Sequence, residues 1–373
     1  MNTSGSLGFI ALHRLFLAAL ALVCFFSLPA TAIASHLAPI DLRCAGESEP
    51  LAAAQSQPEL SWRLGASAPN LYSVSQSAYQ IQVSKQVGPD ADFSSALWDS
   101  GEVHSAATFG VPYAGPALEP GRQYAWRVRV WDENGTPSEW SNAAHWTQAP
   151  AWRAKWIAAP KDDPHGPLPI FRKTVMLDHL VRRALVYVSG VGQYELRING
   201  AKVGDDQLTP GWTDYRRTID YDAYDVTPML HAGQNALGVM LGNGMYRVLE
   251  TPGRYTKFVG DYGQPQCIVQ LHIEYADGQA LDVVSDGTWK TASGPITFSS
   301  TYGGEDFDAR REPQGWDSPG FNDQDWQAAA VVKGPGGALV PEIAPPLRVM
   351  QTYTPTKPAQ PRLGVLVYDL GQN

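Results

Sequence analysis

Cysteine and charge are both scarce in this chain of 373 residues. Its three cysteines, Cys24, Cys44 and Cys267, form no CxxC pair and no closely spaced set, which excludes a small scaffold built on disulfides. Charged residues make up 17% of the chain, and the net charge is -9. Because no basic excess is available to neutralise phosphates, the composition argues against a nucleic-acid partner.

Familiar catalytic signatures are also missing. The sequence contains no HExxH, no GxSxG, no phosphate-binding P-loop, and no GxGxxG after a strand. Its eight histidines are scattered, and no two have metal-ligand spacing. We therefore assign no catalytic residue in this chain, and the identity of any metal site stays unknown from the sequence.

Only one apolar run is long enough to suggest targeting. Leu15 to Phe26 follows His13-Arg14 and precedes the small-residue stretch PATAIAS, a pattern typical of a secretory signal peptide over residues 1–34. Cleavage after Ala34 or Ala32 predicts a secreted or periplasmic protein with no membrane association once the signal is removed. An uncleaved N-terminal anchor is the alternative.

The chain is rich in turn formers and aromatics, with 35 Gly, 29 Pro, 12 Trp, 16 Tyr and 11 Phe. Several segments alternate apolar and polar residues, as half-buried antiparallel strands do. Turn signals such as Asn134-Gly135, Asn199-Gly200 and Asp277-Gly278 separate them. The fold class predicted is all-β, in tandem antiparallel sandwiches. The expected strands are 78–84, 124–131, 183–190, 194–200, 235–242 and 266–275.

The first sandwich is expected over residues 37–148. The segment Leu118 to Tyr124 has the spacing of a tyrosine corner, in which a Tyr at a strand start bonds back to the backbone a few residues upstream. Trp62 is expected in the core. Alternation places Trp126, Val128 and Val130 on one strand face and Trp131 on the other.

A second, larger β-domain is expected over 153–335, after a short boundary rich in Ala and Pro. Residues 336–373 are Pro-rich and then begin a further strand. Because one strand buries too little surface to be stable, either this strand joins an earlier sheet or the chain is the front part of a longer protein. We favour a linker and the truncated start of a further β-domain.

Carboxylates cluster in three loops of the second domain, at Asp205-Asp206, at Asp214 and at Glu305-Asp306 with Asp308. Paired carboxyls can hydrolyse a glycosidic bond when they face each other across it. They can also cap turns, pair with arginines, or bind a sugar or Ca²⁺. Sequence alone leaves these alternatives open.

A series of blocks in the second domain makes the resemblance specific. In order and spacing it resembles the N-terminal β-domain of bacterial α-L-rhamnosidases, a jelly-roll-like sandwich, and the region before it resembles that family's fibronectin type III-like N-terminus. The N-terminal region carries Asp41 to Cys44, Leu97 to Gly101 and Pro137 to Ser141. The second domain carries Val188 to Asp205, Leu208 to Tyr215, Tyr221 to Thr227, Leu241 to Tyr246, Gly303 to Arg311 and Gly315 to Trp326.

The resemblance implies a glycoside hydrolase that releases terminal L-rhamnose with inversion. It places catalysis on an (α/α)₆ barrel that follows a further β-domain, and that barrel is missing from this sequence. The chain is therefore expected to be an accessory part of a rhamnosidase, inactive alone. The alternatives are a free-standing carbohydrate-binding module for rhamnose-type sugars, and a pair of spacer domains without a ligand.

A sugar site needs a flat apolar face and fixed polar groups. The residues predicted to form one are Trp212, Asp214, Asn243, Tyr246, Arg247, Glu305 and Asp306. The partner would be an L-rhamnose-containing glycan or glycoside, and the resemblance adds Ca²⁺ as a possible ligand of the same site. Met245 departs from the family, which usually has Trp there. The competing interpretation makes Trp212 a core residue and pairs Glu305 and Asp306 with Arg310 or Arg311.

Overall fold

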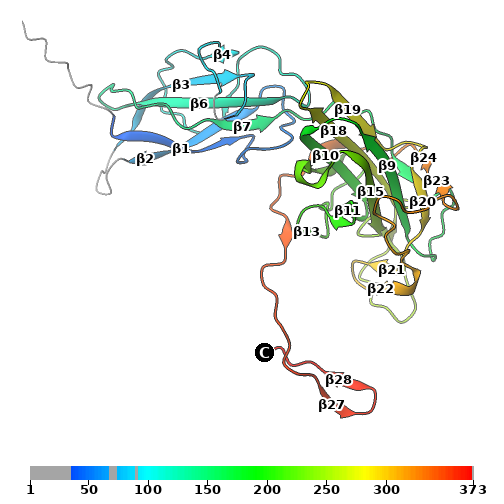
Figure 1. Ribbon diagram of the computed structural model, residues 1–373. Coiled ribbons are helices and arrows are strands. Elements are labelled where there is room, and N and C mark those ends of the chain that lie inside the picture. Colours follow the sequence, from blue (N-terminus) through cyan, green and yellow to red (C-terminus); the bar gives the residue numbers. More distant parts are fainter. Residues whose placement is uncertain (1–34, 67–73, 89–90, 372–373) are drawn as a thin grey trace, which may run out of the picture.

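The computed structural model describes residues 35–66, 74–88 and 91–371. The predicted signal peptide lies outside these residues. Strands dominate, and the described chain forms two β-sandwiches in succession, which confirms the all-β prediction (Figure 1). No helix in the described ranges is both long and apolar enough to cross a membrane.

Two antiparallel sheets make up the first sandwich. One has the order β1-β2-β5 and the other β4-β3-β6-β7. Their inner faces enclose a core around Trp62, Tyr79, Trp126 and Trp146. The bounds are β1 Leu37–Cys44, β2 Glu59–Ala66, β3 Gln76–Ser84, β4 Trp98–Asp99, β5 Val111–Pro112, β6 Gln123–Asp132 and β7 Ala144–Thr147.

Alternation along β6 follows the prediction. Trp126, Val128 and Val130 are buried in the first core, while Trp131 points to the other face. That outer face is not bare, because the Arg129 guanidinium lies 4.9 Å from the Trp131 ring centroid. A cation over an aromatic ring covers apolar surface and is itself stabilised, so Trp131 is buried without entering the core.

The second sandwich has a larger sheet in the order β24-β8-β18-β10-β14-β25, with β19 beside β18, and a facing sheet in the order β12-β11-β15-β9-β20-β23. The larger sheet uses β8 Ile157–Ala158, β10 Val181–Val191, β14 Thr218–Asp225, β18 Gln266–Tyr275, β19 Ala280–Val284, β24 Ala330–Val331 and β25 Ala338–Pro341. The facing sheet uses β9 Pro169–Leu177, β11 Gln193–Ile198, β12 Ala201–Lys202, β15 Gly233–Gly242, β20 Lys290–Ser293 and β23 Gln327–Ala328. A continuous apolar core fills the space between the sheets.

Three short ribbons decorate this sandwich and position its loops. They are β13 Asp206–Gln207 with β26 Leu347–Arg348, β16 Arg247–Val248 with β17 Gly260–Asp261, and β21 Ile296–Ser300 with β22 Gly304–Phe307. Two single-turn 3₁₀ helices, Thr227–Met229 and Ala309–Arg311, complete the domain.

The second sandwich extends past residue 335, where its end was expected. β25 pairs in parallel with β14, so residues 338–341 belong to the larger sheet. Proline-rich composition concealed this strand, although an edge position tolerates Pro because one side of the strand makes no ladder bonds. Farther on, β27 Ala359–Arg362 and β28 Val365–Val367 pair with each other and stand apart from the sandwich in Figure 1.

The two sandwiches meet through an aromatic contact. Trp152 from the boundary segment packs edge-on against Tyr221, with ring centroids 5.1 Å apart, and against Tyr187. Leu51 and Ala52 of the first sandwich join the same cluster. These contacts bury apolar surface from both sandwiches.

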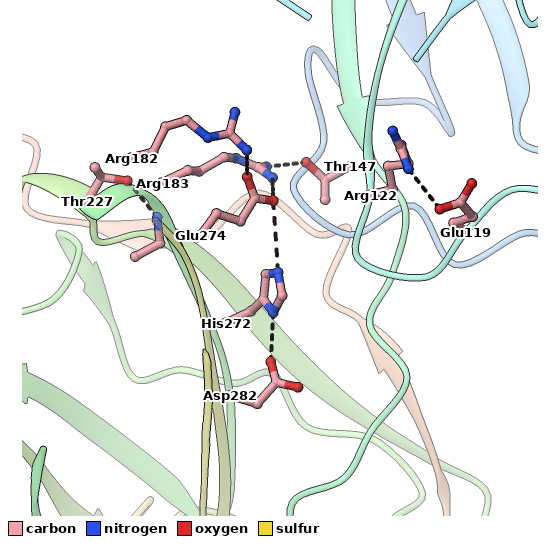
Figure 2. Close-up of polar contacts among 10 residues, drawn as sticks. Glu119, Arg122, Thr147, Arg182, Arg183, Thr227, His272, Glu274 and Asp282 are labelled. Atoms are coloured by element: carbon pink, nitrogen blue, oxygen red, sulfur yellow. Dashed lines mark hydrogen bonds and ion pairs between the residues drawn. The ribbon is translucent and has the colours of Figure 1, made fainter. Parts of the chain in front are cut away.

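A polar contact also joins the two sandwiches, and charged side chains surround it (Figure 2). Arg183 Nη2 on β10 donates to Thr147 Oγ1 on β7 at 2.5 Å. Glu274 on β18 lies between Arg183 and His272, and His272 Nδ1 is 2.6 Å from Asp282 Oδ1 on β19. The interface therefore combines apolar contact with a row of charged side chains.

Candidate functional site

Four aromatic side chains from three loops form an aromatic ridge on the second sandwich: Trp212, Tyr255, Phe258 and Tyr302. Trp212 and Phe258 lie with centroids 6.3 Å apart and planes inclined at 31°, and Tyr302 meets Phe258 edge-on at 5.4 Å. Trp212 is 61% exposed and Tyr255 is 68% exposed. Most buried aromatics serve packing, but exposed rings gathered in one place offer a flat apolar surface to a ligand.

Local contacts hold the ridge in place. Tyr255 and Phe258 lie in the loop between β16 and β17, and Tyr302 lies in the turn between β21 and β22. Arg254 ties the loop to that turn, because its guanidinium stacks 4.8 Å from the Phe298 centroid, pairs with Asp306, and donates to the Gly303 carbonyl at 3.2 Å. A side chain at Gly303 would press on Phe298 and Arg254, so this close approach favours glycine.

Among the predicted sugar residues, Trp212 is part of the ridge. Asp306 lies at the edge of the ridge, where it pairs with Arg254 of the loop that carries Tyr255 and Phe258. Both findings correct the competing interpretation. Trp212 is not a core residue, because its side chain is mostly exposed in the loop between β13 and β14. Asp306 pairs with Arg254, whereas Arg310 pairs with Asp308 at 2.8 Å.

Asp214 and Glu305 are both exposed. Arg216 Nε donates to Asp214 Oδ1 at 2.9 Å, and this bond lowers the pKa of Asp214 below its usual value. The backbone amide of Arg217 also donates to the Asp214 carbonyl, which closes the turn. Asp214 therefore stabilises its own turn, in agreement with the alternative that these acids cap turns. Its carboxylate stays exposed, two residues after Trp212.

Asn243 and Arg247 lie elsewhere, in the wall of a pocket of about 390 Å³. Arg247 is buried, and its guanidinium donates to both oxygens of Asp162 at 2.6 and 2.7 Å and to Asp261 at 3.1 Å. The bonds to Asp162 raise the pKa of Arg247. A bidentate pair of this kind fixes the Asp162 carboxylate at the pocket rim. The pocket is also lined by Lys161, Asp163, Gln264, Thr291, Ser293, Asp325 and Trp326.

Tyr246 is 2% exposed, so its ring cannot serve as a sugar platform in this conformation. It stacks on Tyr262 with centroids 5.8 Å apart and meets Tyr215 edge-on at 5.1 Å. The preceding Met245 is half-buried. The seven predicted residues therefore do not form one ring, because the chain after β15 turns inward at Tyr246.

Ca²⁺ takes six to eight oxygen ligands in proteins. Within the part of the chain that the structure describes, no group of three or more His, Cys, Asp or Glu side chains is arranged to hold a metal ion. The predicted residues therefore do not form a carboxylate cage for Ca²⁺.

Sequence reasoning missed the loop between β16 and β17, which contributes half of the aromatic ridge. A signal was present: Tyr255, Phe258 and Tyr262 fall within a stretch broken by Gly and Pro, where no core strand is expected. Aromatic residues in such a loop either fold under it or stay exposed. Here Tyr255 and Phe258 stay exposed.

Two domain families match the chain in order. Residues 39–151 match the Rha78A-like N-terminal immunoglobulin domain, and residues 179–351 match the α-L-rhamnosidase N-terminal domain. Among curated proteins, an α-L-rhamnosidase of Formosa agariphila is 32% identical over 88% of this chain and 37% of its own length. An α-L-rhamnosidase of Alteromonas sp. is 34% identical over 88% and 37%.

Solved structures agree. The α-L-rhamnosidase from Dictyoglumus thermophilum superposes with a TM-score of 0.75 at 38% identity, over 90% of this chain and 38% of that one. The Streptomyces avermitilis α-L-rhamnosidase in complex with L-rhamnose superposes with a TM-score of 0.73 at 26% identity, over 90% and 49%. This chain thus spans less than half the length of these relatives, and its two β-sandwiches match, in order, the N-terminal domains of α-L-rhamnosidases.

Proposed function

We propose that this chain is the N-terminal accessory part of an exported α-L-rhamnosidase, which releases terminal L-rhamnose from glycosides or polysaccharides. The observation that carries the proposal is the match of both sandwiches, in order, to the N-terminal domains of these enzymes. In the family that the chain resembles, catalysis belongs to a barrel beyond these domains. The two sandwiches would support that barrel.

The chain by itself is expected to hydrolyse nothing. The test is release of p-nitrophenol from its α-L-rhamnoside by the purified chain. Activity above the buffer background that disappears when a single carboxylate is replaced would contradict the proposal. The proposal is supported if the chain alone releases p-nitrophenol only at the background rate, while a longer protein that also includes a catalytic barrel hydrolyses the same substrate.

We also propose that the second sandwich contacts the glycan through the aromatic ridge. Trp212 and Phe258 supply an apolar face for the C–H side of a pyranose, while Asp214, Arg216 and Glu305 supply polar groups nearby. The same surface would serve a free-standing carbohydrate-binding module. Coding sequence downstream of Asn373 that encodes a helical barrel would favour the accessory role over the module.

The binding test is calorimetric titration with L-rhamnose, with and without Ca²⁺. Loss of binding in Trp212→Ala would assign the sugar to the ridge. Loss in Asn243→Ala, with Trp212→Ala unaffected, would move it to the pocket beside Arg247. Flat titrations at millimolar sugar would leave this domain as a scaffold.

Export is the remaining part of the proposal. Expression with residues 1–34 in a bacterial host is expected to give a processed protein that begins at Ser35 or Ile33. N-terminal sequencing of the exported fraction measures this. An intact Met1 in the membrane fraction would instead indicate an uncleaved anchor.

A further inference from the structure

Residues 342–348, between β25 and the end of β26, lie against the second sandwich with little apolar burial. Ile343 is 73% exposed and Leu347 is 63% exposed. β26 contributes only the two-residue pairing of Leu347 and Arg348 with β13. Hydrophobic burial therefore contributes little to holding this segment, and its polar contacts decide whether it stays docked.

Those contacts occur at both ends of the segment. At the far end, Arg348 Nε is 3.0 Å from Asp205 Oδ1 and 3.2 Å from Asp206 Oδ1. At the near end, the backbone amide of Gly211 donates to both carboxylate oxygens of Glu342, each at 3.2 Å. The Glu342 amide itself donates to the Tyr221 carbonyl at 2.9 Å.

A row of side chains from the sandwich joins the two ends. Tyr224 OH donates to Asp206 Oδ2 at 3.0 Å, and Tyr194 OH donates to Asp222 Oδ2 at 2.5 Å. The two phenol oxygens are 3.3 Å apart. Asp206 and Asp222 are therefore linked beneath the segment through two tyrosines.

Thr209 completes the row. Its hydroxyl has a single proton to donate, and the carboxyl groups of Asp222 and Glu342 both lie near it. Its Oγ1 lies 2.6 Å from Asp222 Oδ2 and 3.5 Å from Glu342 Oε2, so the shorter bond takes the proton. Glu342 then faces Asp222 with no hydroxyl proton left to share. Two carboxylates this close repel each other in a partly dehydrated site.

Burial first, and then the neighbouring Glu342, raise the pKa of Asp222 to about 7, in spite of the lowering effect of the bonds from Thr209 and Tyr194. Burial and Asp222 also raise the pKa of Asp220, on the same strand. Cations near the row attach to Asp206: Lys202 Nζ donates to its carbonyl at 2.7 Å, and Arg348 pairs with its carboxylate. Across the same cleft the first sandwich presents Arg43, Glu47 and Glu49.

We propose that Asp222 and Glu342 form an acid-dependent latch, which holds residues 342–348 on the second sandwich while Asp222 is protonated and loosens when both groups are charged. Because the acidity of Asp222 is weakened in the docked state, docking is favoured in acid and is progressively lost as the pH rises towards about 7. The segment leads into β27 and β28, so the latch sets how freely everything after Arg348 can move.

The experiment places a trifluoromethyl probe on Ile343→Cys in the purified chain and follows its ¹⁹F signal from pH 5 to pH 8. The probe is placed on the chain without residues 1–34, which removes Cys24, and Cys44 and Cys267 are buried, so labelling is directed to position 343. We expect a docked signal at pH 5 and a second, released signal that grows with a midpoint near neutrality. The docked-to-released ratio should fall about tenfold across this range, equivalent to one unit of pKa coupling.

Asp222→Asn keeps an acceptor for Thr209 and Tyr194 but removes the charge, and Glu342→Gln does the same from the segment. Either variant should keep the docked signal at pH 8. Asp214→Asn, at an exposed carboxyl of the same domain, is the matched control and should titrate like the unsubstituted chain. A probe signal independent of pH, or wild-type titration in both Asp222→Asn and Glu342→Gln, would overturn the latch.

Discussion

The backbone amide of Glu119 donates to the hydroxyl of Tyr124 at 2.7 Å, which closes a tyrosine corner at the start of β6. Tyr124 is fully buried, and its ring stacks on Trp146 with centroids 5.2 Å apart. Between the two bonded residues, Gly121 takes a positive φ, and its amide donates to the carbonyls of Gln148 and Ala149. The corner therefore fixes the entry to β6 against the segment that leaves the first sandwich.

Replacing Tyr124 by Phe should lower the free energy of unfolding by about 1–2 kcal/mol, because the Glu119 amide loses its partly buried acceptor while the ring stays in place. Denaturant midpoints at constant slope measure this. Tyr255→Phe, on an exposed ring, is the control and should change nothing measurable. Equal midpoints for Tyr124→Phe and the unsubstituted chain would show that the hydrogen bond of the tyrosine corner does not stabilise the fold.

Among the arginines and lysines, we expect replacement of Arg172 on β9 to lower the free energy of unfolding most. It is 1% exposed, and it donates to the carbonyls of Trp316 at 2.8 Å and Ser318 at 2.9 Å while pairing with Asp323. Arg172→Leu leaves these acceptors unpaired, which should cost about 3–5 kcal/mol by chemical denaturation.

The matched control for Arg172 is Arg310→Leu. That arginine pairs with Asp308 on the surface, where solvent screens the charges and the ion pair adds little to stability. A similar loss from both variants would contradict a structural role for Arg172 beneath the 316–323 loop.

Trp212→Ala should weaken binding of L-rhamnose-type glycans about tenfold or more while leaving unfolding within about 0.5 kcal/mol, because the ring is mostly exposed. Titration calorimetry and denaturation separate the two effects. Phe109→Ala removes an exposed aromatic from the first sandwich and should leave binding unchanged. Equal losses from both variants would point to a non-specific effect.

Asp222→Asn should raise the melting temperature at pH 7–8 and lose this advantage as the pH falls towards 4. The sign follows from the raised pKa of Asp222: its protonated form stabilises the fold in acid, and this contribution disappears between its ordinary value and about 7. A gain of about 1–3 kcal/mol at pH 8 is expected. Calorimetric scans of the two proteins across pH 4–8 check it, and parallel curves would contradict it.

Gly192→Ala should destabilise the second sandwich by more than about 3 kcal/mol, because an added Cβ would lie 2.1 Å from the Gly242 carbonyl oxygen at a φ of +103°. Gly278→Ala, also at positive φ but facing open space, isolates the backbone contribution and should cost about 1 kcal/mol. Denaturant midpoints compare them. Equal costs would mean that the backbone approach to Gly242 relaxes freely.

The sequence predicts the positions of strands and turns wherever a pattern of neighbouring residues is sufficient. The alternation in β6 and the long apolar run in β18 both predict strands, and the spacing from Leu118 to Tyr124 predicts the tyrosine corner. Asn199-Gly200 turns between β11 and β12 with both residues at positive φ, as this dipeptide favours. Each of these features depends on neighbours a few residues apart.

β25 was missed because its pairing with β14 joins positions more than a hundred residues apart, and its own composition resembles a linker. Two aromatic residues of the predicted sugar site, Trp212 and Tyr246, show the same limit of prediction from local sequence. Trp212 is exposed and Tyr246 is buried, although both follow turn signals and both are aromatic.

The sequence by itself determined the fold class, the order of the two sandwiches and the family they resemble, because short-range alternation, turn chemistry and ordered blocks suffice for these. Tertiary structure alone decided which aromatics stay exposed and which carboxyls meet. Asp222 and Glu342 are far apart in the chain, yet Thr209 lies between them once β25 joins the sheet. Burial and charge interaction depend on spatial neighbours, and only the packed sheets bring these neighbours together.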